Sequence, residues 1–517
     1  MKNWEIDTAL HEIILDRAEQ LYQEGAYERV VALAAKLAHQ ESNDYIGYLS
    51  SVRLEQLLVK TGAQLFPEAH YAQKSSQERK VLHIDTQFYN IGGHTKVALS
   101  WMENDLRSTS HLLLLDQKET LTAPINGTLH LIQEEGWLHQ AKALRQFLET
   151  HYFDVIVLHQ HMDDVVPTLA LWDIKEATDT LVLFYSHANF RFSLGNIIAH
   201  KRLNICEGDV VISERYRYPM PDDVLYFILG DNLPEPLDAT AIQAHKTTWG
   251  IEPNQTVFLT IGAAYKYTPF EDLNFFAEWN AFLMDNPEAV LVVIGCDQSD
   301  FERFCPQATK APNLLLQGLV QDPTAYYQVA DYIVDIYPLQ TGLGTLNGLY
   351  YGLPPILPYR ETVMVLGKEM NKLYPREVEA YLSYTTQAAY FEFIKKEIAT
   401  GAYKAWAAPY IQAHIQDQFL LEPWRQQLEA LYKAPVPQAP DFDPTKDVLN
   451  TSAPSQNWYN FTASPHRSVK LIALAMQYGA PLTARLLGLY WNILWNRKQL
   501  SGAGLRVLGN YLLGTYR

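Results

Sequence analysis

The first 60 residues carry apolar positions at helical spacing. Ala9, Ile13 and Ala18 belong to one such series, Gly25 interrupts it, and a second series opens at Tyr27. Because spacings of three and four residues place side chains on one face of a helix, we expect two helices joined at the glycine. The stretch resembles one tetratricopeptide-type hairpin, but the three repeats that a solenoid needs are not visible. A helical cap on the next domain is the alternative, and we favour it.

From residue 81 the pattern changes to short apolar runs separated by helical stretches. The runs lie at 81–85, 111–116, 128–132, 155–161, 180–187, 209–213 and 224–229, and a second series lies at 256–262, 289–295, 313–318, 332–338 and 354–358. Such runs, alternating with helices, are typical of a parallel sheet covered on both faces. They predict an α/β chain with two Rossmann-like domains in tandem. Ligands of these sheets bind beyond the carboxyl ends of the strands, so we expect a site in the cleft between the domains.

These patterns also predict the boundaries of the segments. We expect a helical extension at 1–78, a first Rossmann-like domain at 79–240 and a second at 241–433. A linker rich in Pro, Ser and Asn follows at 434–465, and a helical, aromatic tail occupies 466–517.

Charge is distributed unevenly along the chain. The 41 basic and 58 acidic residues give a net charge of −17, which argues against a nucleic-acid partner. After Asp447 there is no acidic residue but seven basic ones. A basic tail with Trp491 and Trp495 suits the interface of an anionic membrane, and equally suits packing against the acidic body or a subunit interface. Both interpretations stay open.

The cysteine spacing and the length of the apolar runs indicate the cellular compartment. Cys206, Cys296 and Cys305 form neither a zinc-binding spacing nor a disulfide framework. Residues 1–16 lack a secretory signal, and no run reaches the roughly 18 apolar residues of a membrane span. We therefore expect a cytoplasmic protein, with peripheral contact at the inner face of the membrane as the alternative.

Candidate chemistry in the first domain begins with a glycine turn after the run at 81–85. Gly92 and Gly93 let backbone amides approach a ligand, and His94 and Thr95 follow them at a helix start. His187 ends the run at 180–187. Histidine accepts a proton near neutral pH, so His94 and His187 are candidates for a general base. A tight turn with a surface histidine is the alternative.

More polar residues crowd the end of the run at 155–161, namely His159, His161, Asp163 and Asp164. Metal ligation is a competing use of such residues. Because no HExxH or CxxC motif supports it, we expect no metal ion.

In the second domain, Lys266 follows the first strand-like run. A lysine at a strand end can neutralise the charge that develops on a diphosphate leaving group. The run at 332–338 is followed by a loop with Gly342, Gly344 and Thr345, where a helix opens, and free amides at a helix start favour phosphate. We also place Gln317, at the end of the run at 313–318, among the donor-binding residues. An ordinary strand-to-helix turn is the alternative for the loop.

The stretch 256–358 resembles the donor-binding domain of GT-B glycosyltransferases. YKYTP at 265–269, ADYIVDIYP at 330–338, the Gly/Thr loop and GLP at 352–354 are similar to stretches of O-linked N-acetylglucosamine transferases and bacterial adhesin N-glucosyltransferases. The resemblance implies that Lys266 binds the nucleotide diphosphate and that Gly344 and Thr345 lie near the phosphate.

The chain departs from this family pattern at Asn347, which stands where those transferases often have an acid. Retaining GT-B enzymes carry an acid-x7-acid pattern whose ends would here be Leu339 and Asn347, so we expect inversion of the sugar's configuration. GGHT at 92–95 and YSHAN at 185–189 also resemble motifs of uncharacterised bacterial glycosyltransferases.

The resemblance, over about 80–433, implies a metal-independent glycosyltransferase that uses a UDP-linked sugar as substrate and has no cofactor. The first domain would bind the acceptor, which is a protein, a glycan or a lipid-linked molecule. Two alternatives are a catalytically degenerate GT-B protein that binds or assembles a partner glycosyltransferase, and a GT-B-fold sugar epimerase.

Overall fold

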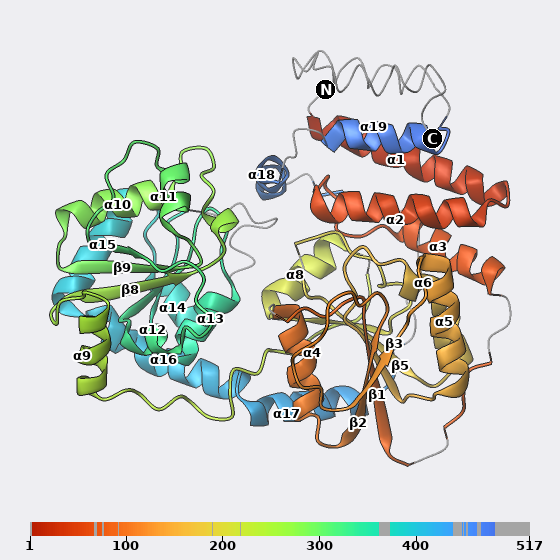
Figure 1. The fold of residues 1–517 in the computed structure, drawn as a ribbon, viewed down its shortest axis with the longest axis horizontal. Helices are drawn as coiled ribbons and strands as arrows, with labels where there is room; N and C mark the ends of the chain where they lie inside the picture. Colours follow the sequence, from red (N-terminus) through yellow and green to blue (C-terminus); the bar gives the residue numbers. More distant parts are fainter. Residues whose placement is uncertain are drawn as a thin grey trace. The chain divides into compact units, whose positions relative to one another are not determined.

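The computed structural model describes residues 3–66, 70–74, 77–90, 93–188, 190–217, 219–360, 373–437, 447, 449–450, 453–462 and 467–480. The chain forms two compact units (Figure 1). The first comprises residues 1–205, 209–225 and 433–517, and the second comprises 206–208 and 226–432. The helical extension and the described part of the tail thus belong to the same unit as the first sheet.

The first unit is built on a parallel sheet of seven strands in the order β3-β2-β1-β4-β5-β6-β7. The strands are β1 (Arg79–Asp85), β2 (Ser108–Leu114), β3 (Thr128–Leu131), β4 (Val155–Leu158), β5 (Leu181–Tyr185), β6 (Lys201–Asn204) and β7 (Asp222–Val224). Every residue of β4 and β5 is buried, as expected for strands covered on both faces. Helices of this sheet are α4 (Gly93–Asn104), α5 (Trp137–Thr150), α6 (Val166–Ala170), α7 (Ile174–Ala177) and α8 (Glu207–Tyr216).

The strand predicted at 209–213 is wrong, because these residues lie in α8. The buried positions there are Asp209, Ile212 and Ser213, which recur at helical spacing and not at every second residue. Tertiary packing has overridden the β-preference of the two valines and the isoleucine. The strand predicted at 224–229 is shifted to Asp222–Val224, and β6 was not predicted.

A helical bundle completes the first unit. It consists of α1 (Asn3–Gln23), α2 (Tyr27–Asn43), α3 (Val52–Leu65), α18 (Ala453–Phe461) and α19 (Arg467–Gln477). Gly25 has φ +72°, so it makes the turn that the sequence predicts between the first two helices. In Figure 1, α19 runs alongside α1, and it packs on both α1 and α2.

The described part of the tail is therefore core. Leu471, Ile472 and Ala475 are completely or almost completely buried in one cluster with α1, α2 and the first sheet. Asp7 of α1 accepts hydrogen bonds from Tyr459 of α18 and from Ser468 of α19. Residues 481–517, with Trp491 and Trp495, lie outside the described residues, so the membrane interpretation of that stretch stays a prediction. Among the described residues, no helix is long and apolar enough to span a bilayer.

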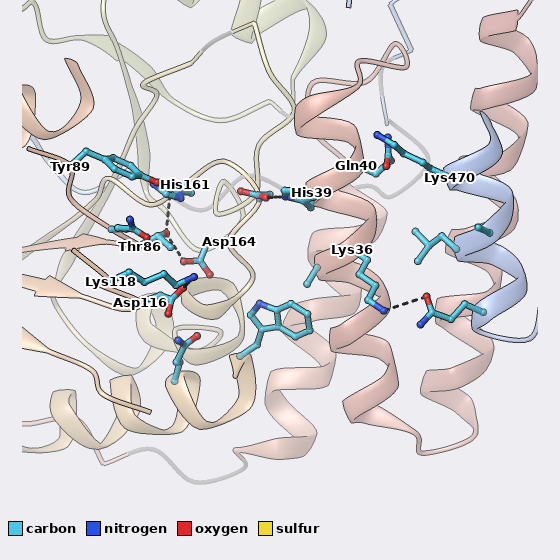
Figure 2. Close-up of a pocket in the computed structure, with 18 residues that line it drawn as sticks. Lys36, His39, Gln40, Thr86, Tyr89, Asp116, Lys118, His161, Asp164 and Lys470 are labelled. Atoms are coloured by element: carbon cyan, nitrogen blue, oxygen red, sulfur yellow. Dashed lines mark hydrogen bonds and ion pairs between the residues drawn. The ribbon is translucent and has the colours of Figure 1, made fainter. Parts of the chain in front are cut away.

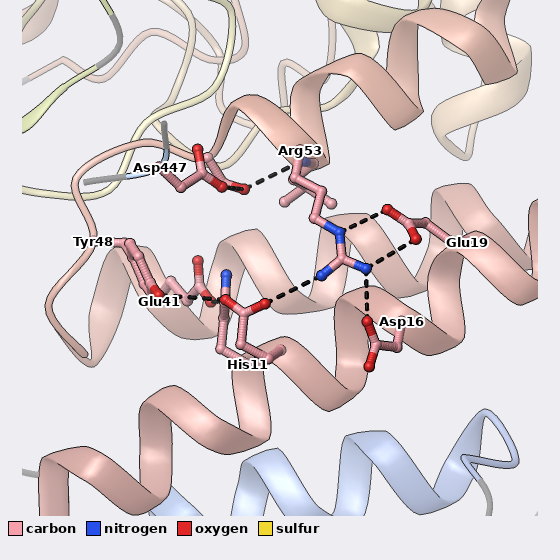
Figure 3. A network of polar contacts seen from close by, with 10 residues as sticks. His11, Asp16, Glu19, Glu41, Tyr48, Arg53 and Asp447 are labelled. Atoms are coloured by element: carbon pink, nitrogen blue, oxygen red, sulfur yellow. Dashed lines mark hydrogen bonds and ion pairs between the residues drawn. The ribbon is translucent and has the colours of Figure 1, made fainter. Parts of the chain in front are cut away.

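Ionic contacts also hold the bundle together (Figure 3). The Arg53 guanidinium of α3 lies 2.6–3.1 Å from three carboxylates of α1, those of Glu12, Asp16 and Glu19. Asp447 accepts hydrogen bonds from the hydroxyl of Ser51, at 2.8 Å, and from the amide of Val52. It thereby satisfies an amide at the start of α3 that has no partner within the helix.

The second unit has a parallel sheet of five strands in the order β10-β9-β8-β11-β12. The strands are β8 (Thr256–Ile261), β9 (Ala289–Ile294), β10 (Leu314–Leu316), β11 (Tyr332–Val334) and β12 (Pro355–Ile356). The helices are α9 (Ala239–Thr248), α10 (Phe275–Asp285), α11 (Gln298–Phe304), α12 (Thr324–Val329), α13 (Leu343–Tyr350), α14 (Arg376–Tyr381), α15 (Gln387–Thr400), α16 (Ala402–Gln418) and α17 (Leu421–Lys433), with a short 3₁₀ helix at Ala264–Tyr267. Two Rossmann-like sheets with helical additions at both ends confirm the predicted fold class.

Candidate functional sites

In the second unit, Lys266 lies against the glycine and threonine loop. Its ammonium donates a hydrogen bond to the backbone carbonyl of Gln340 at 2.8 Å and lies 3.4 Å from that of Thr341. No carboxylate of the described residues lies within ion-pair distance of it. Burial lowers the pKa of Lys266 to about 8, although the nearby Asp335 carboxylate acts in the opposite direction.

Asp335 holds the loop in shape, a role that its place in the sequence did not predict. Its buried carboxylate accepts hydrogen bonds from Tyr374 Oη at 2.7 Å, from Gln340 Nε2 at 3.0 Å and from the amide of Thr341 at 3.1 Å. Thr345 Oγ1 lies 3.3 Å from the same carboxylate. A detectable signal was present, since an acid directly after a buried strand is unusual.

The glycines of this loop are required by its backbone. Gly342 has φ +64°, a conformation that favours glycine, and it directly precedes α13. At Gly344 a side chain would place its Cβ 2.9 Å from the carbonyl oxygen of Ile261. The amides at the start of α13 therefore lie close to the end of β8, and Lys266 lies in the 3₁₀ helix that follows this strand.

Two predicted donor residues have other contacts in this structure. Asn347 Nδ2 donates to the carbonyl of Leu343 at 2.8 Å, within its own helix. Gln317 Oε1 accepts a hydrogen bond from Tyr326 at 3.1 Å and follows β10, two strands away from β8. Their roles in donor binding stay predictions.

In the first unit, the two predicted histidines lie together. The rings of His94 and His187 stack with their centroids 3.8 Å apart. His94 lies in the first turn of α4, and His187 follows β5. Thr95 is buried and accepts a hydrogen bond from the amide of Tyr89 at 2.9 Å, so it shapes the turn. Gly93 begins α4, and Gly92 lies outside the described residues.

His83 and His159 extend the pair into a chain of imidazole contacts that the sequence did not predict. His159 Nδ1 lies 2.9 Å from His187 Nε2, and His159 Nε2 lies 3.0 Å from His83 Nδ1. Burial lowers the pKa of His83 to about 3, and it lowers those of His159 and His187 well below the ordinary value. These three imidazoles are therefore neutral and weakly basic near neutral pH.

His94 differs because it has a carboxylate partner. Its Nε2 lies 2.9 Å from Oδ2 of Asp85, the fully buried last residue of β1, and also contacts the carbonyl of His159. Burial alone would lower the pKa of His94, but the charge and hydrogen bond of Asp85 raise it above the ordinary value. Nε2 carries the proton that it donates to the carbonyl of His159 beside Asp85, so Nδ1 is the nitrogen that can accept one. Asp85 was part of the predicted strand and received no role from the sequence.

His161 completes a group of three. Ligand-type atoms of Asp85, His94 and His161 all lie within 4.8 Å of one another, close enough in principle to hold a metal ion. Two imidazoles and a carboxylate are a common zinc ligand set. The expected absence of a metal ion therefore stays a prediction.

Comparisons with solved structures identify the fold of the chain. No protein-family model matches the chain, and no curated protein matches it. Among solved structures, HepE from Anabaena in complex with UDP and glucose is similar at 14% identity, with a TM-score of 0.50 over 69% of this chain and 100% of that chain. A Rickettsia africae glycosyltransferase is similar at 11% identity, with a TM-score of 0.49 over 69% and 98% of the two chains. A mutant O-GlcNAc transferase of Thermobaculum terrenum has 13% identity, a TM-score of 0.45 and coverage of 88% and 82%. The first likeness shows the predicted GT-B fold.

Proposed function

We propose that the chain is a glycosyltransferase that moves a sugar from a UDP-linked donor to an acceptor, without a metal ion and with inversion. The observation that carries the proposal is Lys266, a buried cation whose hydrogen bonds go to backbone carbonyls and whose pKa is lowered to about 8. A group whose charge is so poorly compensated favours an anionic ligand. The loop amides at the start of α13 are a second group of donors for the same anion.

The second unit would stabilise the leaving group. When the bond between the anomeric carbon and the diphosphate breaks, negative charge develops on the diphosphate oxygen. The Lys266 ammonium and the loop amides offset that charge, and Asp335 keeps the loop in position for it. HepE, which shares the fold, is bound to UDP and glucose in its solved structure, which supports a UDP-linked donor.

The acceptor would be activated in the first unit. His94 Nδ1 takes the proton from the acceptor, and the acceptor atom forms its bond to the anomeric carbon as UDP leaves. Asp85 orients the imidazole through Nε2 and stabilises the imidazolium that forms. His187 is the weaker candidate for the base, because burial holds its pKa well below the ordinary value. Its ring stacks on that of His94 at an interplanar angle of 23°.

The test is a screen of nucleotide sugars for a shift of the thermal midpoint, followed by a measurement of UDP release with acceptor pools. UDP-sugars should raise the midpoint, and Lys266→Ala should abolish the shift and slow transfer by about 10²-fold or more. If no UDP-sugar shifts the midpoint and no UDP is released, the proposal is wrong.

A second candidate, a catalytically degenerate GT-B protein that binds a partner, is favoured by Asn347. Its amide replaces an acid and is hydrogen-bonded within α13. Tight binding of a nucleotide, without turnover in any combination of donor and acceptor, would favour this candidate over the enzyme.

A further inference from the structure

The first unit contains a cavity of about 800 Å³ that the sequence did not predict (Figure 2). Its walls come from segments far apart in the chain: α2, the residues after β1, β2 and β4, the start of α5, and α19 near the end of the described chain. In Figure 2, Lys36 and His39 of α2 face Thr86, Lys118 and His161 across the cavity. The volume lies in the range of about 300–1,000 Å³ that is usual for pockets enclosing a small molecule.

One wall of the cavity adjoins the candidate base. His161 lines the cavity, and its ring centroid lies 5.8 Å from that of His94. On its other side, His161 stacks on Tyr89 with an interplanar angle of 1°. The amide of His161 donates to Thr86 Oγ1 at 2.9 Å, which fixes this part of the wall. A ligand in the cavity would therefore reach the Asp85–His94 pair by passing His161.

The cavity is lined by as many lysines as aspartates, namely Lys36, Lys118 and Lys470 and Asp116, Asp163 and Asp164. Lys118 lies 2.9 Å from Asp116, and His39 lies 2.6 Å from Asp163. The Lys36 ammonium donates to the side-chain carbonyl of Gln477 at 3.3 Å. Because the positive and negative side chains of the lining are equal in number, the cavity has no strong preference for an anion or a cation. A neutral molecule with many polar groups fits this lining better than an ion does.

The other lining groups indicate which class of polar molecule the cavity binds. Four amide side chains, each able to donate and to accept, line the cavity: those of Gln40, Gln87, Gln140 and Gln477. Two aromatic side chains join them with large exposed fractions, 39% for Trp137 and 37% for Tyr89. Sugar rings present hydroxyls that donate and accept, and apolar C–H faces that pack on aromatic rings. Apolar residues are few, namely Ala35, Ala473 and Leu474, which disfavours an acyl chain.

We propose that this cavity binds an oligosaccharide, so that the acceptor of the reaction is a glycan whose reacting end lies beside His94. The inference rests on the proposed function, and it names the acceptor class that the fold leaves open. It also assigns a role to the additions at the two ends of the chain, because α2 and α19 supply the wall that faces the sheet.

The experiment uses the full chain on an array of immobilised oligosaccharides, with no nucleotide sugar present. We expect retention of a subset of glycans. Trp137→Ala and Gln87→Ala should each weaken retention about tenfold or more, because each removes a contact inside the cavity. Leu106→Ala is the matched control, since Leu106 is 71% exposed and does not line the cavity.

Binding of UDP to the same variants separates the two proposals. UDP affinity should be unchanged in Trp137→Ala, whereas Lys266→Ala should lose UDP binding and keep glycan binding. If the chain binds UDP but retains no oligosaccharide, or if a peptide array is retained in a manner that depends on Trp137, the glycan inference is overturned and the proposed function stands. If glycans bind but no UDP-sugar does, the cavity assignment stands and the proposed function fails.

Discussion

The affinity of the chain for UDP should fall above pH 8, because Lys266 loses its charge there. Burial lowers the folded-state pKa of this lysine from 10.5 to about 8. The protonated form is the one that attracts a diphosphate. Affinity is therefore close to its maximum well below pH 8, is halved near pH 8, and is lost as the pH rises further through the folded-state pKa.

The size of the effect follows from the protonated fraction. With a pKa of about 8, this fraction falls from roughly 0.9 at about pH 7 to roughly 0.1 at about pH 9, and the apparent dissociation constant should rise about tenfold. A lysine with the ordinary pKa would stay more than about 95% protonated, so the constant would change by less than about 5% over the same interval. The two cases are easily distinguished.

Isothermal titration calorimetry with UDP at several pH values measures this dependence. Near pH 8 binding should also take up about half a proton, which is detected by comparing buffers of different ionisation enthalpy. Lys266→Arg is the control, because a guanidinium stays charged throughout and any titration of the nucleotide itself appears equally in both proteins. A dissociation constant that is constant between pH 7 and 9, or that changes equally in Lys266→Arg, would show that Lys266 does not titrate in this range when it binds UDP.

Three other predictions concern the first unit. His94→Ala should lower turnover about 10²-fold or more and leave UDP affinity unchanged, because a base acts on the acceptor; a collapse of UDP affinity in binding assays would make His94 a donor ligand. Dialysis against EDTA should leave the rate of UDP release unchanged; a loss restored by zinc would identify Asp85, His94 and His161 as a metal centre. Leu471→Ala should reduce the free energy of unfolding by about 2–5 kcal/mol in denaturant titrations, since Leu471 is fully buried, and a change within the error of the control Leu106→Ala would contradict its place in the core.

The sequence by itself was sufficient for the elements whose signal is local. Continuous apolar runs predicted the two parallel sheets, because strands buried on both faces need apolar residues at every position. Helical spacing and Gly25 predicted the first helical hairpin. Lys266, His94 and His187 could be selected because each stands at or after the end of a strand-like run, and the carboxyl ends of parallel strands are where ligands bind.

The local sequence pattern gave the wrong element, or no role, where long-range contacts override secondary-structure propensity or complete a site. At 209–213 a β-branched stretch became α8, since packing places Asp209 and Ile212 inside at helical spacing. Asp85 ends one predicted run and Asp335 lies inside another, and only the fold brings them to His94 and to the loop at Thr341.

The cavity of the first unit was beyond the reach of any local pattern. Lys36 and Gln477 meet across its wall although 441 positions separate them in the chain. The same packing decided between the two interpretations of the tail for residues 467–480, whose apolar face is buried against α1 and α2. A helix with one apolar face and one basic face has the same sequence pattern whether it covers a core or a membrane, and only the surface that meets the apolar face distinguishes the two.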